Sequence, residues 1–570
     1  MPTNPFLIRT ALVWALAILL AACQPGGTDG AGGSGGGGGP GGGAGGSCGF
    51  AADYPGVPCP DPTTDSLPAG IMPDLPTPRA APGWEGYDPV AIPTPAPERC
   101  TTEYAAGEAL PRDLVLAAGD VVCFSGQASA TRTLRVDATA CTAQAPCWFA
   151  GRGGGLTSSA QPAVEVQGRH VIFDGLQLNV VRSGIDILPG SRYITVRNST
   201  IVGDGSDGGG AGIDIAGDAQ GEIRYVMVYG NRFDNIGPSD GGPLGGEAHQ
   251  VRPSWYARYV WIVDNVFGDS DGDAIQGGNS KTPSQRSGEG QNAAKSPHYV
   301  WIAGNRFEGV SENAVDLKNS YHVVISGNEV VTPVRETVII LSQDSEGFWT
   351  GYHWAIANRL IGGGGECIGV RGNEENFYGT FYDYNFVIAN TAYDCNGLLS
   401  FQSGNSATAG PETYVLYNTF VSNLATPYTR RAPVYKAQNR QENVVEFIGN
   451  IFYGNFDPTN GSGGSSYITA NDYLTVTFTA YDNLYYQVDG LDLPFLSRIN
   501  ANHLNVAGNR HADPLFTDEA AHDYSLREGS PARNATERSS SAFDLFERFY
   551  GFDLRTALGL DGRNNIGASQ

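Results

Sequence analysis

The sequence predicts an all-β solenoid in which short strands stack as successive rungs around one apolar core. Ten asparagines recur at intervals of 23 to 40 residues, each after a short apolar strand: Asn198, Asn231, Asn265, Asn305, Asn328, Asn358, Asn390, Asn418, Asn450 and Asn483. The flanking segments repeat as well, as in VWIVDNVF, VWIAGNRF and VVISGNEV. An irregular period of this size, with β-branched strands and no helical pattern, is typical of a solenoid built from strands.

Alternate positions within each predicted strand are Val, Ile, Leu or Phe, which we expect to point inward. Parallel pairing would then join each rung to the next at about 4.8 Å. Equivalent positions of successive repeats should therefore be neighbours in space.

The N-terminus has the features of an export signal. Arg9 precedes the apolar run Ala11–Ala22, which is too short to span a bilayer. The junction Leu20-Ala21-Ala22-Cys23 resembles the lipobox of bacterial lipoproteins. The resemblance implies a signal peptide over 1–22, lipidation of Cys23, and, from the following Gln24, an outer-membrane lipoprotein facing the periplasm or the cell surface. An ordinary secretory signal with an incidental cysteine is the alternative.

Residues 23–99 are predicted to form a tether. Gly26–Gly46 is nearly pure glycine, and 53–98 is rich in proline. Such segments lack the apolar side chains needed for a core. We expect a flexible leash followed by a stiffer spacer.

Eight further cysteines form an even set, which favours disulfides in an exported chain. The sequence contains no C-x-x-C pair, which disfavours a cysteine metal site. The pairs we predict, among connectivities that the sequence leaves open, are Cys48–Cys59, Cys100–Cys123, Cys141–Cys147 and Cys367–Cys395.

The net charge of −24, from 35 basic and 59 acidic residues, limits the partners. A chain this acidic should repel nucleic acid and anionic lipid. It should also repel acidic polysaccharides unless cations or a local basic patch intervene.

Several segments resemble the pectate-lyase-like right-handed parallel β-helix superfamily over about residues 105–567. They include LVLAAGDVVCFSG, VEVQGRHVIFDGLQL, the GNxF rungs, and the closing HADPLFTDEAAHDYSLREGSPARNA. The resemblance implies a right-handed parallel β-helix of about ten or more rungs, in which asparagine amides bond between turns. We expect a cap with the first strands over 100–165, the β-helix over 166–515, and a C-terminal tail packing on it over 516–570. The superfamily holds many activities, so the fold does not choose among them.

Aligning the strands after each asparagine turn predicts a polar outer face. One column would be Asp186, Asp214, Gln250, Gln276, Asp316, Ile339 and Gly369. A second, two residues on, would be Leu188, Ala216, Arg252, Gly278, Lys318, Leu341 and Arg371. A third, three residues before the first, would be Glu247, Asp273, Asn313, Glu336 and Glu366. Insertions at Ser239–Glu247 and Asn279–Ser296 could form walls beside this face.

Acidic residues on and near this face suggest a Ca²⁺ site. Asp186 and Asp214 should be rung partners, and carboxylates this close repel each other unless a proton or a cation intervenes. The segment GDSDGDA adds Asp269, Asp271 and Asp273, but it fails as an EF-hand loop because Ala274 stands at position six, the glycine position, and Ser280 at position twelve, the glutamate position. An irregular Ca²⁺ site and a set of solvated turn aspartates both remain open.

Three other groups have a functional and a structural interpretation. Lys318 is either a base, with its pKa lowered by a neighbouring cation and by Arg252 or Arg371, or a surface ion pair with Asp316. His249 aligns with the inward residues Ile275 and Val315, which favours a core histidine over a catalytic one. Trp261 and Trp301 should stack outward, either holding sugar rings or covered by a loop.

We therefore expect a carbohydrate-active protein, foremost a polysaccharide lyase that cleaves a uronate polymer by β-elimination. In superfamily lyases a lysine or arginine is the base, which would make Lys318 the base and Arg252 or Arg371 the carboxylate partner, with Ca²⁺ ligands among Asp214, Asp273 and Asp316. Gln250, Gln276, His249 and the two tryptophans would bind substrate. A noncatalytic polysaccharide-binding or adhesion protein is the alternative, and a glycoside hydrolase is third. We expect a monomer that binds polysaccharide and no nucleic acid, with its lipid anchor in a membrane.

Overall fold

A computed structural model describes residues 96–568 except 143, 207–208, 219, 238–247, 279–295, 311, 344–349, 372–383, 403–411, 423–433, 437–441, 455–465, 471–473, 489–492, 498, 551–552 and 561. The predicted signal peptide, Cys23, most of the tether, the pair Cys48–Cys59 and nearly all of the two wall insertions lie outside these residues. Within the described part, no helix is both long and apolar enough to cross a bilayer.

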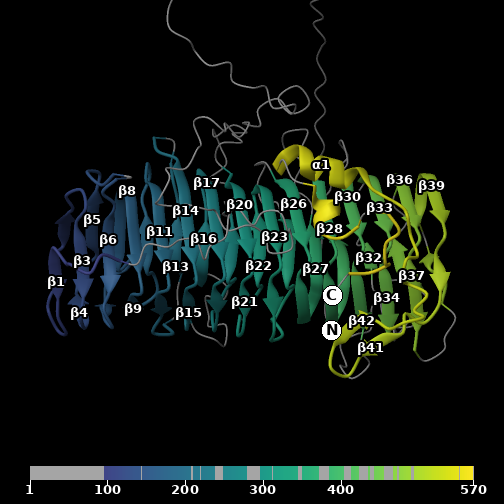
Figure 1. The fold of residues 1–570 in the computed structure, drawn as a ribbon, viewed down its shortest axis with the longest axis horizontal. Coiled ribbons are helices and arrows are strands. Elements are labelled where there is room, and N and C mark those ends of the chain that lie inside the picture. Colours follow the sequence, from purple (N-terminus) through teal and green to yellow (C-terminus); the bar gives the residue numbers. More distant parts are fainter. Residues whose placement is uncertain are drawn as a thin grey trace, which may run out of the picture. The chain divides into compact units, whose positions relative to one another are not determined.

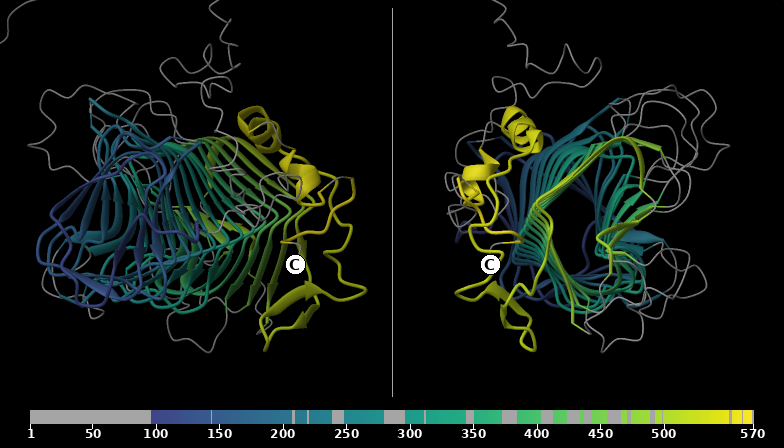
Figure 2. Two further views of the ribbon diagram at one scale, coloured as in Figure 1. Left: turned by 60° about the vertical axis from the view of Figure 1, so that its left-hand side comes forward. Right: turned by 90° about the vertical axis from the view of Figure 1, so that its right-hand side faces the viewer.

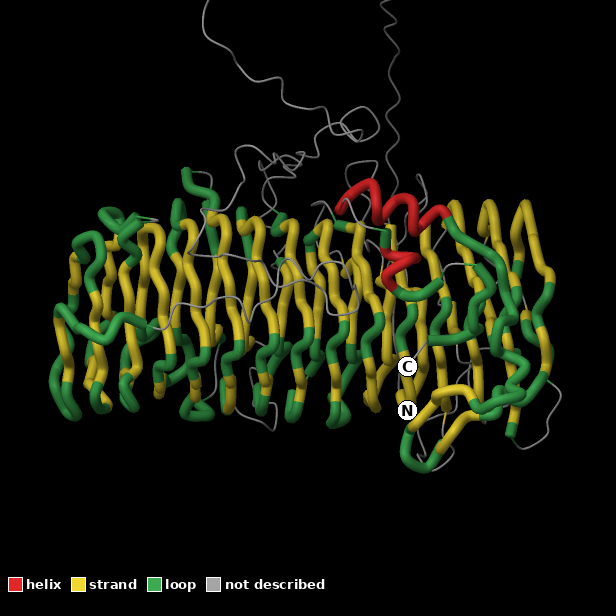
Figure 3. The backbone as a smooth tube through the Cα atoms, viewed as in Figure 1, coloured by secondary structure: helices red, strands yellow, loops and turns green. Residues whose placement is uncertain are grey.

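The strands pair in parallel from rung to rung and form three ladders (Figure 1, Figure 3). The first ladder, which carries the predicted polar face, contains β2 (Asp113–Val115), β5 (Leu134–Ala138), β8 (Val164–Asp174), β10 (Ile185–Ile187), β13 (Gly210–Ile215), β16 (Ala248–Pro253), β19 (Ile275–Gly277), β22 (Val315–Lys318), β25 (Ile339–Gln343), β27 (Arg359–Arg371), β29 (Thr391–Gln402), β32 (Val434–Lys436), β35 (Ile468–Ala470) and β38 (Leu496–Ser497).

The second ladder follows the first after a short turn in each rung. It contains β1 (Thr102–Tyr104), β3 (Val121–Phe124), β6 (Cys147–Gly151), β8, β11 (Arg192–Arg197), β14 (Ile223–Tyr229), β17 (Ala257–Val263), β20 (His298–Ala303), β23 (Tyr321–Ser326), β26 (Gly351–Ile356), β28 (Tyr384–Ile388), β30 (Glu412–Leu416), β33 (Glu442–Ile448), β36 (Leu474–Tyr481) and β39 (Asn500–Ala507).

The third ladder follows the asparagine turn. It contains β4 (Gln127–Ala130), β7 (Gly155–Ser158), β9 (Gln177–Asn179), β12 (Thr200–Val202), β15 (Arg232–Asp234), β18 (Val266–Phe267), β21 (Arg306–Phe307), β24 (Glu329–Val330), parts of β27 and β29, β31 (Thr419–Ser422), β34 (Ile451–Gly454), β37 (Leu484–Gln487) and β40 (Arg510–His511). Seen along the stack, successive rungs overlie one another (Figure 2). The predicted right-handed parallel β-helix is confirmed.

The core fills the coil with one continuous column of apolar side chains. Ile213 and Ile215 of β13 are fully buried and stack on Ile185 and Ile187 of β10. At the third ladder, the rings of Phe233, Phe267 and Phe307 stack at centroid distances of 5.2 and 5.0 Å. The predicted boundary between the cap, which ends at residue 165, and the β-helix, which begins at 166, falls inside β8. The coil is continuous there, because β8 belongs to both the first and the second ladder.

Buried asparagines form a hydrogen-bonded ladder between the second and third strands of each rung. The Nδ2 atom of Asn231 donates to Oδ1 of Asn265 at 3.0 Å and to the carbonyl of Val196 at 2.8 Å. The pattern repeats through Asn265, Asn305, Asn328, Asn358, Asn390, Asn418, Asn450 and Asn483, and continues to Asn509. These bonds satisfy backbone groups that would otherwise be buried without partners.

Asn198 does not belong to the asparagine ladder, so its predicted place was wrong by one residue. Ser199 occupies the ladder position, and its backbone N–H donates to Oδ1 of Asn231 at 2.9 Å. Asn198 instead has φ of 50°, the left-handed conformation that Gly230 takes in the next rung. Asparagine tolerates this conformation better than most residues, so it can occupy either turn position.

The C-terminal segment packs along the outside of the coil (Figure 2). Helix α1 (Ser541–Tyr550) buries Phe543, Phe546 and Phe549 against the outer face of the second ladder, around Trp354 and Phe386. The antiparallel hairpin of β41 (Phe516–Asp518) and β42 (Asp523–Leu526) packs against the third-ladder residues. The short helix α2 (Leu554–Ala557) follows, with Asp553 as its N-cap.

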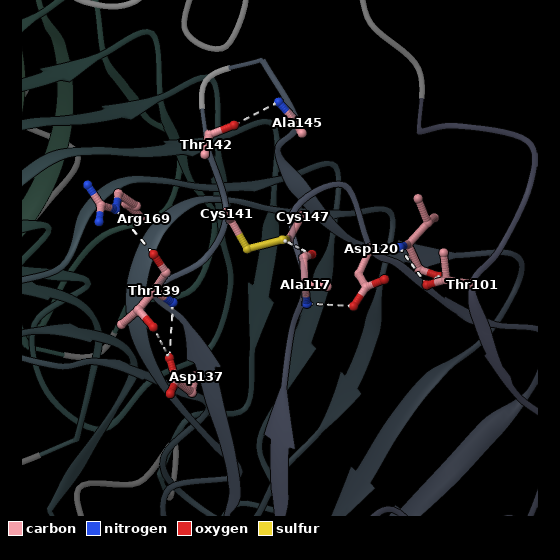
Figure 4. Close-up of a disulfide and its surroundings, with 11 residues drawn as sticks. Thr101, Ala117, Asp120, Asp137, Thr139, Cys141, Thr142, Ala145, Cys147 and Arg169 are labelled. Carbon is pink, nitrogen blue, oxygen red and sulfur yellow. Dashed lines mark hydrogen bonds between the residues drawn. A yellow bond between two sulfur atoms is a disulfide. The ribbon is translucent and has the colours of Figure 1, made fainter.

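Three predicted disulfides are confirmed: Cys100–Cys123, Cys141–Cys147 and Cys367–Cys395. Figure 4 shows the second of these, which ties the end of β5 to the start of β6. Next to it, Asp120 accepts a hydrogen bond from the backbone of Ala117 at 2.7 Å and closes a turn. These bridges hold the early rungs and the rung pair β27–β29.

We predict that Asn328→Ala destabilises the fold by about 3 kcal/mol, because it deletes two donors and leaves two buried donors of Asn305 without their acceptor. Thermal unfolding should show a clear loss relative to Asn179→Ala, an exposed asparagine of β9. Equal melting temperatures for the two variants would contradict a stabilising role for the asparagine ladder.

Candidate functional site

The candidate site lies on the outer face of the first ladder, between β10 and β22. Ile213, Val251, Ile275 and Val315 are in-register partners that enter the core. The next residue of each strand lies on the outer face, because side chains alternate along a strand. The resulting column is Asp186, Asp214, Arg252, Gln276 and Asp316.

This register corrects the predicted columns at two rungs. Arg252, and not Gln250, continues the column, because Val251 is the residue of β16 that enters the core. Ile340, and not Ile339, is the partner of Asp316. In the third column Thr337, and not Glu336, precedes Glu366, to which its hydroxyl donates at 3.0 Å. Arg371 lies in this part of the face and donates to Thr337 Oγ1 at 3.4 Å.

Asp186, Asp214 and Arg252 form the first charged group. Arg252 binds Asp214 through two bonds, with Nε–Oδ1 of 3.1 Å and Nη2–Oδ2 of 2.7 Å. Asp186 is the in-register partner of Asp214 in the preceding rung and lies beside this ion pair. Burial, and then the negative charge of Asp214, raise the pKa of Asp186 to about 7 against the opposing effect of Arg252. Asp186 is therefore protonated in much of the neutral range.

Lys318 and Asp316 form the second charged group. Their Nζ and Oδ2 atoms are 2.9 Å apart, and the side chains are 17% and 3% exposed. Burial alone would lower the pKa of Lys318, but Asp316, Asp273 and Glu312 together raise it above its ordinary value. The prediction of a lowered pKa was therefore wrong, because the lysine lies among carboxylates and not among cations. Burial and Asp273 raise the pKa of Asp316 despite its lysine partner.

Asp273 is the buried centre that links the two groups. Its Oδ1 accepts from Asn313 at 2.7 Å and its Oδ2 from Gln276 at 3.1 Å. His249 Nδ1 lies 3.7 Å from Oδ2. His249 pairs with Ala211 and not with the inward residues Ile275 and Val315 that the sequence suggested. Burial, and then Arg252 and Lys318, lower the pKa of His249 to about 3, so its ring is neutral.

Sequence reasoning missed Glu312, which belongs to this site. Burial, and then Asp273, raise the pKa of Glu312 well above its ordinary value, although Lys318 opposes them. The residue directly precedes Asn313 of the third column, and its carbonyl accepts from the backbone of Glu336 in the next rung. The sequence signal that could have identified Glu312 is its position directly before Asn313, a member of the third predicted column.

The other predicted ligands of the site do not converge. Gln250 is fully buried, and its amide donates to the carbonyls of Gly268 and Asp269, which holds the turn before β19. Asp269 is exposed on that turn, whereas Asp271 is buried. Among the described residues, no three acidic, histidine or cysteine side chains are grouped to hold a metal ion. The described residues therefore do not assemble the predicted Ca²⁺ site, which stays a prediction from the sequence, and we derive no step through it.

Trp261 and Trp301 lie on a different face. They belong to the second ladder and stack at 5.0 Å with an angle of 3° between the rings. Trp261 is buried in a cluster with Tyr225 and Met227, and Trp301 meets the edge of Tyr550 from α1 at 6.2 Å. The two rings are stacked as the sequence suggested, but they are not beside the charged column.

Neither a protein-family profile nor a curated protein sequence matches this chain. Several solved structures are similar in strand arrangement. A catalytic domain of a GH87 α-1,3-glucanase is 11% identical, with a TM-score of 0.35, over 71% of this chain and 64% of that one, which is less than two thirds of its length. A mannuronan C-5 epimerase A-module from Azotobacter vinelandii is 11% identical, with a TM-score of 0.36, over 72% and 89%.

A PL6-family polysaccharide lyase from Pseudopedobacter saltans is 11% identical, with a TM-score of 0.33, over 75% of this chain and 97% of that one. The three proteins have different activities. At these identities and TM-scores the comparisons carry no argument about the chemistry of this chain.

We predict that Asp186→Asn stabilises the protein above pH 7. The raised pKa means that the folded state holds a proton that the unfolded state releases near pH 4, so stability falls as pH rises from about 4 to 7. The asparagine variant lacks this loss, which corresponds to at most roughly 4 kcal/mol. Melting temperatures of wild type and variant should be close at pH 4 and diverge by pH 8. A constant difference across this range would contradict the raised pKa.

Proposed function

We propose that the protein is a carbohydrate-active enzyme that binds a uronate polymer across the outer face of the first ladder and cleaves it by β-elimination. The observation that carries this proposal is the pairing of two largely buried cations with carboxylates, Arg252 with Asp214 and Lys318 with Asp316. In a chain with net charge −24, these are two cations of this face that could exchange their carboxylate partners for the carboxylate of an acidic sugar.

Elimination requires the C5 proton of a uronate to be removed while its C6 carboxylate is neutralised. Protonated Lys318, together with Arg252, would bind that carboxylate and stabilise the charge that develops. Once Lys318 turns to the substrate, Asp316 loses the cation that lowers its pKa and becomes a stronger proton acceptor. This assignment gives the base role to Asp316 in place of Lys318.

The step balances with Glu312 as the proton donor. The C5–H bond breaks and its proton passes to Asp316, while the electron pair forms the C4–C5 double bond. The C4–O bond then breaks, and the leaving oxygen takes the proton that the raised pKa keeps on Glu312. The products are an unsaturated uronate and a new hydroxyl end.

Hydrolysis is the second candidate, because Asp186 also keeps a proton in the neutral range. A protonated carboxyl beside an ionised one is the arrangement that glycoside hydrolysis uses. A purely binding protein would use the same cations without turnover. The outer-membrane anchor and a Ca²⁺ site stay predictions from the sequence, and the steps above use neither.

We predict that Asp316→Asn lowers kcat on the cleaved polymer by about 10²- to 10⁴-fold, and that Lys318→Ala lowers kcat/KM to a similar degree. The assay incubates purified protein with a panel of uronate polymers, with Ca²⁺ or with a chelator, and follows the ultraviolet absorbance of the double bond. Asp518→Asn, an exposed aspartate of β41, is the matched control.

Three results would separate the candidates. Unsaturated product that disappears in both site variants supports elimination. New reducing ends without absorbance identify hydrolysis and reject the proposal. Binding of several polymers without any product, in wild type and variants alike, identifies a noncatalytic protein.

A further inference from the structure

A column of arginines marks the start of four strands in the second ladder, outside the candidate site. Arg169, Arg192, Arg224 and Arg258 are direct partners in the parallel pairing of β8, β11, β14 and β17. We call these four residues the arginine track. Because β8, β11, β14 and β17 are neighbouring strands (Figure 1), these in-register residues follow one another at the strand spacing of about 4.8 Å. The turn 254–256 separates the last of them from β16.

In the described part of the chain, Glu222 is the carboxylate that pairs with the arginine track, and it pairs with two of the four arginines. Arg224 and Arg258 share one carboxylate, that of Glu222, at 2.7 and 2.6 Å. Arg169 and Arg192 are exposed, and in the described part of the chain neither forms an ion pair. Like charges on directly opposite strand positions destabilise a sheet. The track therefore concentrates positive charge within an acidic protein, where composition alone would not place it.

A column of stacked rings runs directly beside the arginine track. His170, Tyr193, Tyr225, Tyr259 and Tyr299 each occupy the position after the arginine or its equivalent. Their ring centroids lie 4.7, 4.8, 5.1 and 5.0 Å apart in succession. The column continues through His322 and Tyr352, where Phe549 of α1 contacts both rings. The rungs of the arginine track precede this covered part.

Backbone conformation keeps both columns outside the core. Each of the five ring residues has φ between 54° and 60°, a region that costs a non-glycine residue roughly 1–3 kcal/mol. The effect is visible in β14, where Ile223 and Val226 both enter the core and the two residues between them, Arg224 and Tyr225, do not. β17 repeats the pattern with Ala257 and Val260 around Arg258 and Tyr259. In four successive rungs an arginine therefore directly precedes the ring residue.

This combination fits a polymer that carries one carboxylate per sugar ring. Its charges would recur at a spacing close to the roughly 4.8 Å of the strands. Its sugar rings could contact the outward edges of the half-buried rings of Tyr193 and Tyr259, whose faces stack on neighbouring rings. Duplex nucleic acid carries one charge per about 1.7 Å, so the net charge of −24 would oppose it more strongly. The two exposed arginines, Arg169 and Arg192, are the counter-charge that this surface offers the sparser polymer.

We propose that the arginine track and its ring column form a second binding surface, specific for an anionic polysaccharide and distinct from the charged column of the first ladder. It would hold a long acidic chain along the coil. This role does not require that the first ladder be catalytic, so the two proposals can fail independently.

The test compares the affinity of the full protein for polygalacturonate with and without the double change Arg169→Gln and Arg192→Gln. All proteins carry Lys318→Ala, which should slow turnover by about 10²- to 10⁴-fold. The matched control removes two exposed arginines elsewhere, Arg112→Gln and Arg533→Gln, so net charge is equal. We expect about tenfold weaker binding for the track variant, since each surface contact contributes of order 1 kcal/mol or less. The control should stay within about twofold, a difference of a few tenths of a kcal/mol.

Two companion measurements make the outcome decisive. A polygalacturonate whose carboxylates are reduced to alcohols should show no difference between the variants. Melting temperatures should not fall in the track variant, because it relieves repulsion between exposed cations. Equal affinity of the two variants for the acidic polymer, or no binding by any of them, overturns the proposal. Equally strong, equally track-dependent binding of duplex DNA overturns the assignment to polysaccharide.

Discussion

In-register parallel pairing between rungs is the constraint on which both charged surfaces depend. Side chains alternate between the core and the outside, so a slip by one residue would move an entire strand's polar residues into the core. The hydrogen bonds from Asn231 to Asn509 fix this register at one corner of the rungs that they connect. The stacked core residues fix it along each strand. Residues that lie 23 to 40 positions apart in sequence thereby become direct neighbours.

Burial gives the first ladder its chemistry. A cation and a carboxylate on an exposed surface contribute little, but the same pair with most of its surface buried shifts the protonation of everything around it. The guanidinium of Arg252 is used by Asp214, which leaves Asp186 to hold a proton. The arginine track shows the opposite situation, in which two exposed cations have no carboxylate of their own. The first-ladder site is suited to proton transfer, and the arginine track is suited to binding an anionic ligand.

Much of the fold could be predicted because the asparagines recur at intervals of one rung and apolar residues occupy alternate positions of each strand. The strands and the core positions follow from apolar spacing, whereas the even cysteine count predicts disulfides without fixing their pairing. The register could not be predicted everywhere, because insertions such as 238–247 remove the constant spacing on which an alignment relies. Gln250 and Arg252 are both polar neighbours of Val251, and only the pairing decides which of them continues the column.

The protonation of the site was harder still to predict than its position. Lys318 was expected beside cations, but the fold surrounds it with Asp316, Asp273 and Glu312, two of which come from the turn before a strand. The arginine track could not be predicted from the aligned column, because it lies where four strands enter the second ladder. A search for residues preceding each left-handed aromatic would have found it, because the dipeptides Arg169-His170, Arg192-Tyr193, Arg224-Tyr225 and Arg258-Tyr259 repeat with the rungs.

The register of β13 against β16 can be measured by a double-mutant cycle on Asp214→Ala and Arg252→Ala. If the two residues face each other as described, their coupling energy in unfolding should be about 1–3 kcal/mol. A cycle of Asp214→Ala with Gln250→Ala should then show a much smaller coupling, because Gln250 bonds to the turn before β19. A coupling near zero between Asp214 and Arg252 would contradict the pairing on which the proposed site rests.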